Sequence, residues 1–147
     1  MFQHTRLIVM LLVCVCGTSL AQEGLPACKD LRSDRQILKV RVSPGVAASI
    51  AKETSEIALD DETASKLKEL KSLRVVFLSN TEGRIACFDI VEMKGASDPA
   101  LLRLAVAKGL LTWQFKIYEI QGKPVFLESR VRLQRRKNIL KPEFEKD

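Results

Sequence analysis

Apolar and polar residues alternate in several short stretches of the chain, and such alternation is typical of half-buried strands. A helical spacing of apolar residues appears instead over residues 98–113, where Pro99 can occupy the first helical position. Residues 60–72 also favour a helix, because acidic residues at the start and lysines after them complement its dipole. The stretches that predict strands are 37–43, 73–80, 85–93, 115–120 and 125–133.

These elements follow one another as strand, helix, strand, strand, helix, strand, strand, while residues 46–59 fit either a helix or an extended segment. This order predicts a small α+β domain, with an antiparallel sheet and two helices packed on one of its faces. We expect the domain to span residues 37–134, after a leader segment at 22–36 and before a flexible tail at 135–147.

The N-terminus has the pattern of an export signal. Arg6 precedes an apolar run that is shorter than the roughly 20 residues needed to cross a bilayer, and small residues follow up to Ala21. We therefore predict a signal peptide over residues 1–21 and a periplasmic or secreted protein. The alternatives are an uncleaved membrane anchor and a lipoprotein modified at Cys16, which the bulky Val15 before it disfavours.

The chain is basic, with 24 lysines and arginines against 18 acidic residues and a net charge of +6. Part of the excess lies in residues 130–141. A basic balance favours contact with acidic surfaces such as lipid headgroups or acidic envelope proteins. A solvated strand face is the plainer interpretation of this cluster. We expect no nucleic-acid partner, because the aromatic residues are not interleaved with the basic ones.

Two cysteines, Cys28 and Cys87, remain after the predicted signal peptide. In an oxidising compartment they can form a disulfide that closes a long loop, worth about 4 kcal/mol on the chain-entropy model. The alternative is that Cys87 is a buried thiol within an apolar strand. The sequence alone leaves both interpretations open.

The sequence contains few of the residues and motifs that usually form a catalytic site. The only histidine is His4, within the predicted signal peptide, and no phosphate-binding glycine loop is present. Asp89 lies in the middle of an apolar strand, where alternation places it with Ile85, Cys87 and Val91. A hydrogen-bonded or solvent-facing carboxylate is the preferred interpretation of Asp89. We expect no enzyme activity, no cofactor, no metal and no small-molecule substrate.

A pattern of glycines, prolines and aromatic residues is formed by Gly83, Gly95, Pro99, Trp113, Phe115, Gly122 and Pro124. It resembles the C-terminal domain of TonB-type energy transducers. The resemblance covers roughly residues 38–133 and is most specific where the second helix ends in a tryptophan followed by a turn. Ile117 stands where that family has proline, and neither a proline-rich spacer nor a clear anchor is visible.

The resemblance implies binding by strand addition, in which an exposed sheet edge pairs with a partner's peptide. The strand at 125–133 is the expected edge, with Val125, Leu127, Arg130 and Arg132 as partner-binding residues. The first hypothesis is an exported cell-envelope module that docks an envelope or outer-membrane transport protein. The alternative is a homodimeric structural component of the envelope, without a transport role, that pairs with itself through this edge.

Overall fold

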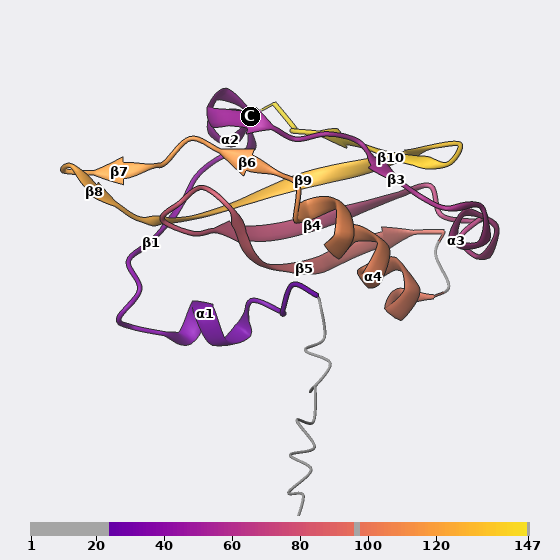
Figure 1. Cartoon of the computed structure of the whole chain (residues 1–147), viewed down its shortest axis with the longest axis horizontal. Coiled ribbons are helices and arrows are strands. Elements are labelled where there is room, and N and C mark those ends of the chain that lie inside the picture. The colour runs from indigo at the N-terminus through magenta and orange to yellow at the C-terminus, as the bar shows by residue number, and fades with distance from the viewer. Residues whose placement is uncertain (1–23, 96–97, 147) are drawn as a thin grey trace, which may run out of the picture.

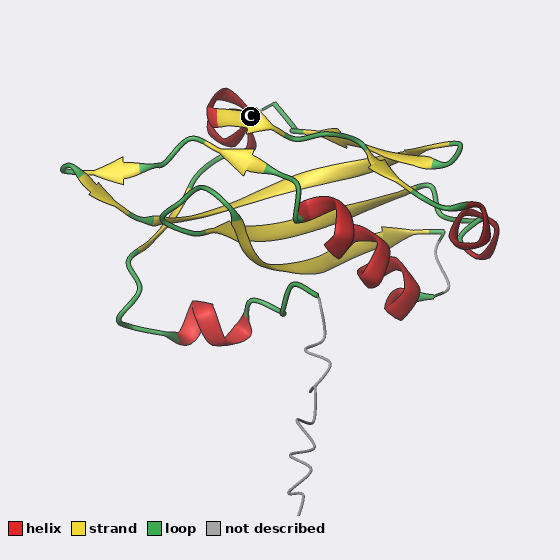
Figure 2. Cartoon of the chain, in the orientation of Figure 1, coloured by secondary structure: helices red, strands yellow, loops and turns green. Residues whose placement is uncertain are grey.

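The computed structural model describes residues 24–95 and 98–146. The predicted signal peptide lies outside these residues. In chain order the elements are α1 (Lys29–Ser33), β1 (Lys39–Arg41), α2 (Pro44–Ile50), β2 (Ala51–Glu53), β3 (Ile57–Ala58), α3 (Asp61–Lys66), β4 (Ser72–Ser79), β5 (Ile85–Lys94), α4 (Pro99–Leu110), β6 (Gln114–Phe115), β7 (Glu119–Ile120), β8 (Lys123–Pro124), β9 (Phe126–Arg136) and β10 (Ile139–Glu143) (Figures 1 and 2).

The main sheet has the strand order β3–β10–β9–β4–β5, and β1 pairs in parallel with the first residues of β9. The other neighbours in this sheet are antiparallel. In Figure 1 the strands lie one below another from β10 to β5, α4 crosses in front of the lower ones, and α1 lies below β5. The predicted α+β fold class is confirmed.

Strand β9 lies in the interior of the sheet, so the prediction that residues 125–133 form an exposed edge is wrong. One side of β9 pairs with β4 over residues 127–134. Its other side pairs with β1 over residues 126–128 and with β10 over residues 132–136. The prediction failed because alternation indicates that residues 37–43 form a strand but not which strand they pair with, and because the five-residue β10 was not predicted at all.

Residues 135–146 do not form the flexible tail that we expected for 135–147. Strand β9 continues to Arg136, and β10 follows it after a tight turn. Leu140 is fully buried, and the ring of Phe144 packs 6.2 Å from that of Trp113. Strand β3 pairs only with the first two residues of β10. Pro142 therefore lies on a locally unpaired edge, where a strand tolerates proline.

Helix α4 begins as the sequence indicates. The Asp98 side chain accepts a hydrogen bond from the Leu101 amide at 3.1 Å, and Pro99 is the first helical residue. The buried side of α4 carries Leu102, Val106 and Leu110. It covers the sheet face that we call the inner face, defined by Leu73, Val75 and Phe77 of β4 and by the side chains that share their side of the sheet.

Trp113 closes the core where α4 ends. Its side chain is fully buried between Phe77 and Phe115, and its indole nitrogen donates to the Ser55 carbonyl at 3.0 Å. An apolar ring system with a satisfied polar atom is well suited to this position. Trp113 thus fixes the corner between α4, the sheet and the segment before β3.

The opposite, outer face of the sheet carries Arg74, Val76 and Leu78 of β4 together with their register partners on β5 and β9. The expectation that Ile85 shares a face with Cys87 and Asp89 is wrong. The β4–β5 register shifts between Leu78 and Ser79, so the strand gains one residue there and Ile85 turns to the inner face. Cys87 and Asp89 remain on the outer face.

Candidate functional site

A disulfide between Cys28 and Cys87 attaches the N-terminal segment to the outer face of the sheet. The two sulfur atoms are 2.05 Å apart, and both residues are fully buried beside Leu78. The disulfide interpretation of these cysteines is confirmed. The bond places α1 next to β5, although 59 residues separate the two cysteines along the chain.

The same N-terminal segment covers part of the free edge of β5. The Phe88 amide donates to the Pro26 carbonyl at 3.1 Å, and the Arg103 guanidinium donates to the Phe88 carbonyl at 3.1 Å. That guanidinium also lies over the Phe88 ring, 4.2 Å from its centre. Both backbone groups of Phe88 are therefore occupied, so an added strand cannot pair with β5 at this residue without displacing the segment.

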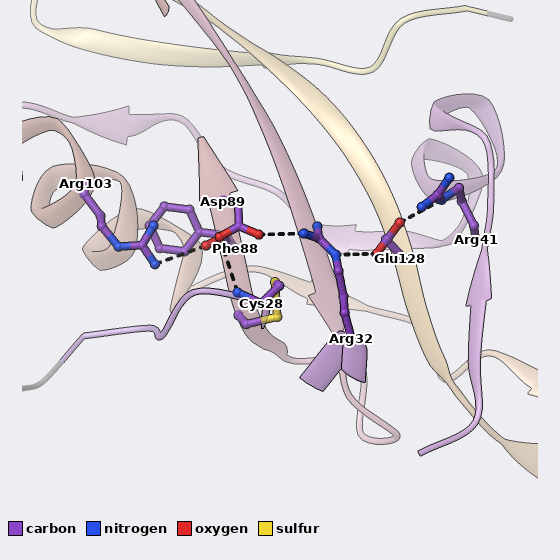
Figure 3. Close-up of polar contacts among 8 residues, drawn as sticks. Cys28, Arg32, Arg41, Phe88, Asp89, Arg103 and Glu128 are labelled. Carbon is purple, nitrogen blue, oxygen red and sulfur yellow. Dashed lines mark hydrogen bonds and ion pairs between the residues drawn. A yellow bond between two sulfur atoms is a disulfide. The ribbon is translucent and has the colours of Figure 1, made fainter. Parts of the chain in front are cut away.

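Four charged side chains form a network across the outer face (Figure 3). Arg32 of α1 bridges Asp89 of β5 and Glu128 of β9, at 2.8 and 2.9 Å. Arg41 of β1 approaches the other oxygen of Glu128 at 2.7 Å. The Cys28 amide also donates to Asp89 at 3.3 Å. Asp89 thus serves as a hydrogen-bonded partner of the N-terminal segment, and the network joins four elements that are distant in sequence.

Glu128 is the centre of this network, since only 10% of its side chain is exposed. Burial by itself would raise the pKa of Glu128, but the hydrogen bonds and positive charges of Arg32 and Arg41 act the other way and prevail. The pKa of Glu128 therefore lies below the ordinary glutamate value. The carboxylate remains ionised at neutral pH and keeps both arginines in place.

The network forms one side of a groove of about 590 Å³ on the outer face. The groove lies between α1, the connection from β1 to α2, and the strands β4, β5 and β9. Its apolar lining comes from Val42, Pro44, Val76 and Val91. Its polar lining comes from Arg32, Arg41, Arg130, Glu128, Ser43 and Ser129.

Arg130 differs from the other two arginines of the groove. Its side chain is exposed, and it forms no hydrogen bond or ion pair with any residue in the described part of the chain. Arg41 is also 82% exposed although it pairs with Glu128. The groove therefore offers guanidinium groups beside an apolar lining, a combination that can hold a carboxylate and an apolar group of the same ligand.

The four residues predicted to bind a partner along 125–133 do not lie on one common surface. Val125 and Leu127 are buried in the core and cannot meet another chain. Arg132 pairs with Glu145 on the outer face. Of the four predicted residues, only Arg130 lines the groove.

The residues that carry the family resemblance mainly shape the fold. Gly83, Gly95 and Gly122 have positive φ angles, and a Cβ at Gly95 would lie 2.0 Å from the Glu69 carbonyl oxygen. Trp113 and Phe115 are fully buried. Pro99 begins α4, and Pro124 ends β8. None of these residues lines the groove.

Three functional candidates, Arg32, Arg41 and Glu128, were missed by sequence reasoning. Arg32 lies in the stretch interpreted as a leader, and Arg41 and Glu128 resemble ordinary solvent-facing strand residues. Glu128 lies 96 residues from Arg32 and 87 from Arg41 in the chain. The disulfide was the only available signal, since it places residue 28, and hence α1, against β5.

Within residues 24–95 and 98–146, no group of three or more His, Cys, Asp or Glu side chains can hold a metal ion. In the same part of the chain, no helix has the length and apolar character needed to cross a membrane. Comparison with known proteins gives no match to a family model, a curated protein or a solved structure. The resemblance to TonB-type domains therefore stays a prediction.

Proposed function

We propose that the protein is an exported binding module of the cell envelope whose groove takes an extended, acidic segment of a partner protein. The observation that carries this proposal is the convergence of Arg32, Arg41 and Arg130 on one groove that also has an apolar lining. The buried Cys28–Cys87 disulfide supports an oxidising compartment, where such bonds persist.

An acidic peptide fits the groove better than a neutral one because of its charge. Arg32 and Arg41 are compensated by Glu128 in the lining and by Asp89 beside it, so the positive charge left in the groove is that of Arg130. Arg130 is left to pair with an incoming carboxylate, while Val76 and Val91 can contact an apolar neighbour of that carboxylate. Because successive side chains of an extended peptide point to opposite sides, a repeat of two acidic and then two apolar residues would present both groups on one side.

The groove replaces the strand edge as the proposed partner site. Strand addition at 125–133 would require a free edge, and β9 has neighbours on both sides. The buried core position of Leu127 also removes it from contact with a partner. Side-chain recognition on the outer face requires neither a free edge nor an exposed Leu127.

A peptide titration tests the proposal. The probe is a blocked peptide that repeats Glu-Glu-Val-Val, compared with one that repeats Gln-Gln-Val-Val, and each is added to the labelled protein in an NMR titration. We expect the Glu peptide to shift the amides of Val76, Val91 and Arg130 first. Arg130→Gln should weaken this binding about tenfold, because a charge-assisted hydrogen bond contributes about 1.5 kcal/mol or more.

Arg136→Gln is the matched control, because Arg136 is an exposed arginine of the same strand that does not line the groove. It should leave the affinity within about twofold, since only the screened long-range charge changes. If the two substitutions weaken binding equally, the loss is due to the change in net charge and not to a contact in the groove. Failure of the Glu peptide to shift these amides would refute the proposal.

Photo-crosslinking from position 130 in intact cells then tests the biological partner. An adduct with another envelope protein supports the binding module. An adduct that contains only a second copy of this chain, together with a dimer by sedimentation, would favour the homodimeric alternative. The Glu–Val titration and the cellular adduct thus separate the chemistry of the groove from the identity of its occupant.

A further inference from the structure

A second hollow, of about 480 Å³, lies where the connection after α3 meets the turn between β9 and β10. Four of its lining residues are cationic, and none is acidic: Lys68, Lys71, Arg135 and Lys137. The remaining lining is neutral and comes from Leu70, Gln134 and Asn138. We propose that this hollow is a binding site for a phosphoryl anion, independent of the groove on the outer face.

The three lysines of this hollow are free to meet a ligand. Lys68, Lys71 and Lys137 are exposed, and within the described residues none forms an ion pair. Lys66, only two residues before Lys68, shows the contrast, because it pairs with Glu62 at 2.6 Å. Three uncompensated ammonium groups around one hollow repel one another, and a multivalent anion between them relieves that repulsion.

Arg135 holds the three lysine-bearing segments in position. Its side chain donates to the carbonyl groups of Leu67, which precedes Lys68, and of Lys137. Its amide donates to the carbonyl of Lys71 at 2.9 Å. The backbone of the hollow is therefore fixed before a ligand arrives, which lowers the entropic cost of binding.

Arg135 also removes a competing negative charge. Its guanidinium donates to the Ala64 carbonyl at 2.8 Å as well as to that of Leu67, at the C-terminal end of α3. The end of a helix carries partial negative charge on such carbonyl groups and disfavours anions nearby. With these carbonyls occupied, the positive charge of the three lysines dominates the hollow.

The kind of cation decides the class of ligand. Lysine ammonium groups act as compact point charges and suit a phosphoryl group, whereas the planar arginines of the outer groove suit a carboxylate. Either an anionic phospholipid headgroup or a soluble phosphate ester can present a phosphoryl group. Lys141 lies across from Gln134 of β9, so the basic surface extends beyond the hollow onto β10, whereas the nearby Lys94 is paired with Glu92.

Two binding assays with the full mature chain distinguish these sources. The first is co-sedimentation with vesicles of phosphatidylglycerol mixed with phosphatidylcholine, against phosphatidylcholine alone. The second is an NMR titration with glycerol 3-phosphate that follows the amides of Lys68, Lys71 and Lys137. The proposal is supported if the protein binds in either assay and the triple variant Lys68→Gln, Lys71→Gln, Lys137→Gln does not. The assay that shows binding then identifies the source of the phosphoryl group.

The triple variant should lower binding about 100-fold at low salt, since each lysine near an anionic surface contributes roughly fivefold. The matched control is Lys52→Gln, Lys116→Gln, Lys123→Gln, which removes the same charge from exposed lysines that do not line the hollow. The control should retain binding within about threefold. The site is refuted if both triple variants lose binding equally, or if the unaltered protein binds neither probe.

Discussion

The inner and outer faces of the sheet are covered in different ways. The inner face packs against α4 and Trp113 in one continuous apolar core, while the outer face holds its cover, α1, through a disulfide and the network around Glu128. Residues of the inner core are almost completely shielded from solvent, whereas Arg41 in the outer network is 82% exposed. The inner face can therefore supply most of the stability.

This difference separates stability from binding within one small domain. Apolar burial is proportional to area and leaves no polar group available for a ligand. Partly exposed arginines contribute little to folding, but they remain accessible. The outer face can accordingly carry a groove whose charged residues change with little effect on the fold. Three experiments test this division, in order of expected effect.

Trp113→Ala should have the largest effect on stability. The substitution empties a buried site between Phe77 and Phe115, and a buried aromatic residue replaced by alanine costs about 3–5 kcal/mol. Urea unfolding followed by circular dichroism measures the free energy, since the chain has no other tryptophan. Leu104→Ala, at a 59% exposed position of α4, is the control and should change it by less than about 0.5 kcal/mol. Similar losses in both variants would show that the inner core does not dominate.

Replacement of both Cys28 and Cys87 by alanine should lower the free energy of unfolding by about 2–4 kcal/mol. The physical reason is the lost constraint on a loop that spans 59 residues of the unfolded chain. Hydrogen exchange should quicken in residues 25–41 well before it quickens in α4. Leu38→Ala, an exposed change in the same segment, should have neither effect. Equal loosening of α4 would contradict the separation of the two faces.

Glu128→Gln should have the smallest effect, about 1–2 kcal/mol at neutral pH, because two hydrogen bonds to charged partners are weakened while the arginines stay partly solvated. The pKa of Glu128 is lowered in the folded state. Its contribution is therefore fully present above the unfolded-state pKa and is lost as the pH falls through the folded-state pKa.

Urea midpoints measured from neutral to acidic pH check this sign. Stability of the unaltered protein should fall on acidification, and Glu128→Gln should remove part of that fall. Glu53→Gln, at an exposed glutamate without an ion pair in the described residues, should leave the pH dependence unchanged. If the Glu128→Gln variant loses as much stability on acidification as the unaltered protein, other carboxylates account for that loss.

Much of the inner face could be predicted from sequence. The β4–β5 hairpin and α4 have long, regular patterns, and the Asp98–Pro99 start is a local signal that needs no tertiary information. Cys28 and Cys87 could be paired as a hypothesis because only two cysteines remained.

The outer face could not be predicted, because its geometry depends on register and on contacts distant in sequence. One extra residue in β5 turns Ile85 to the inner face, and no local pattern reveals that shift. Arg32 and Asp89 meet only because the disulfide places α1 beside β5. Strand β10 was missed because it has only five residues, and its pairing with β9 and with the distant β3 leaves no local pattern.

The pairing of β9 with β1 has a consequence for the order in which the protein can form. Residues 39–41 pair with residues 126–128, so the beginning of the domain waits for almost the whole chain before it has a partner. Contacts this distant in sequence make folding slow. If the chain is threaded through an export channel from its N-terminus, β1 stays unpaired and compatible with threading until β9 has emerged. The same strand order that leaves β9 without a free edge would thus keep β1 without its partner until nearly the whole chain is available.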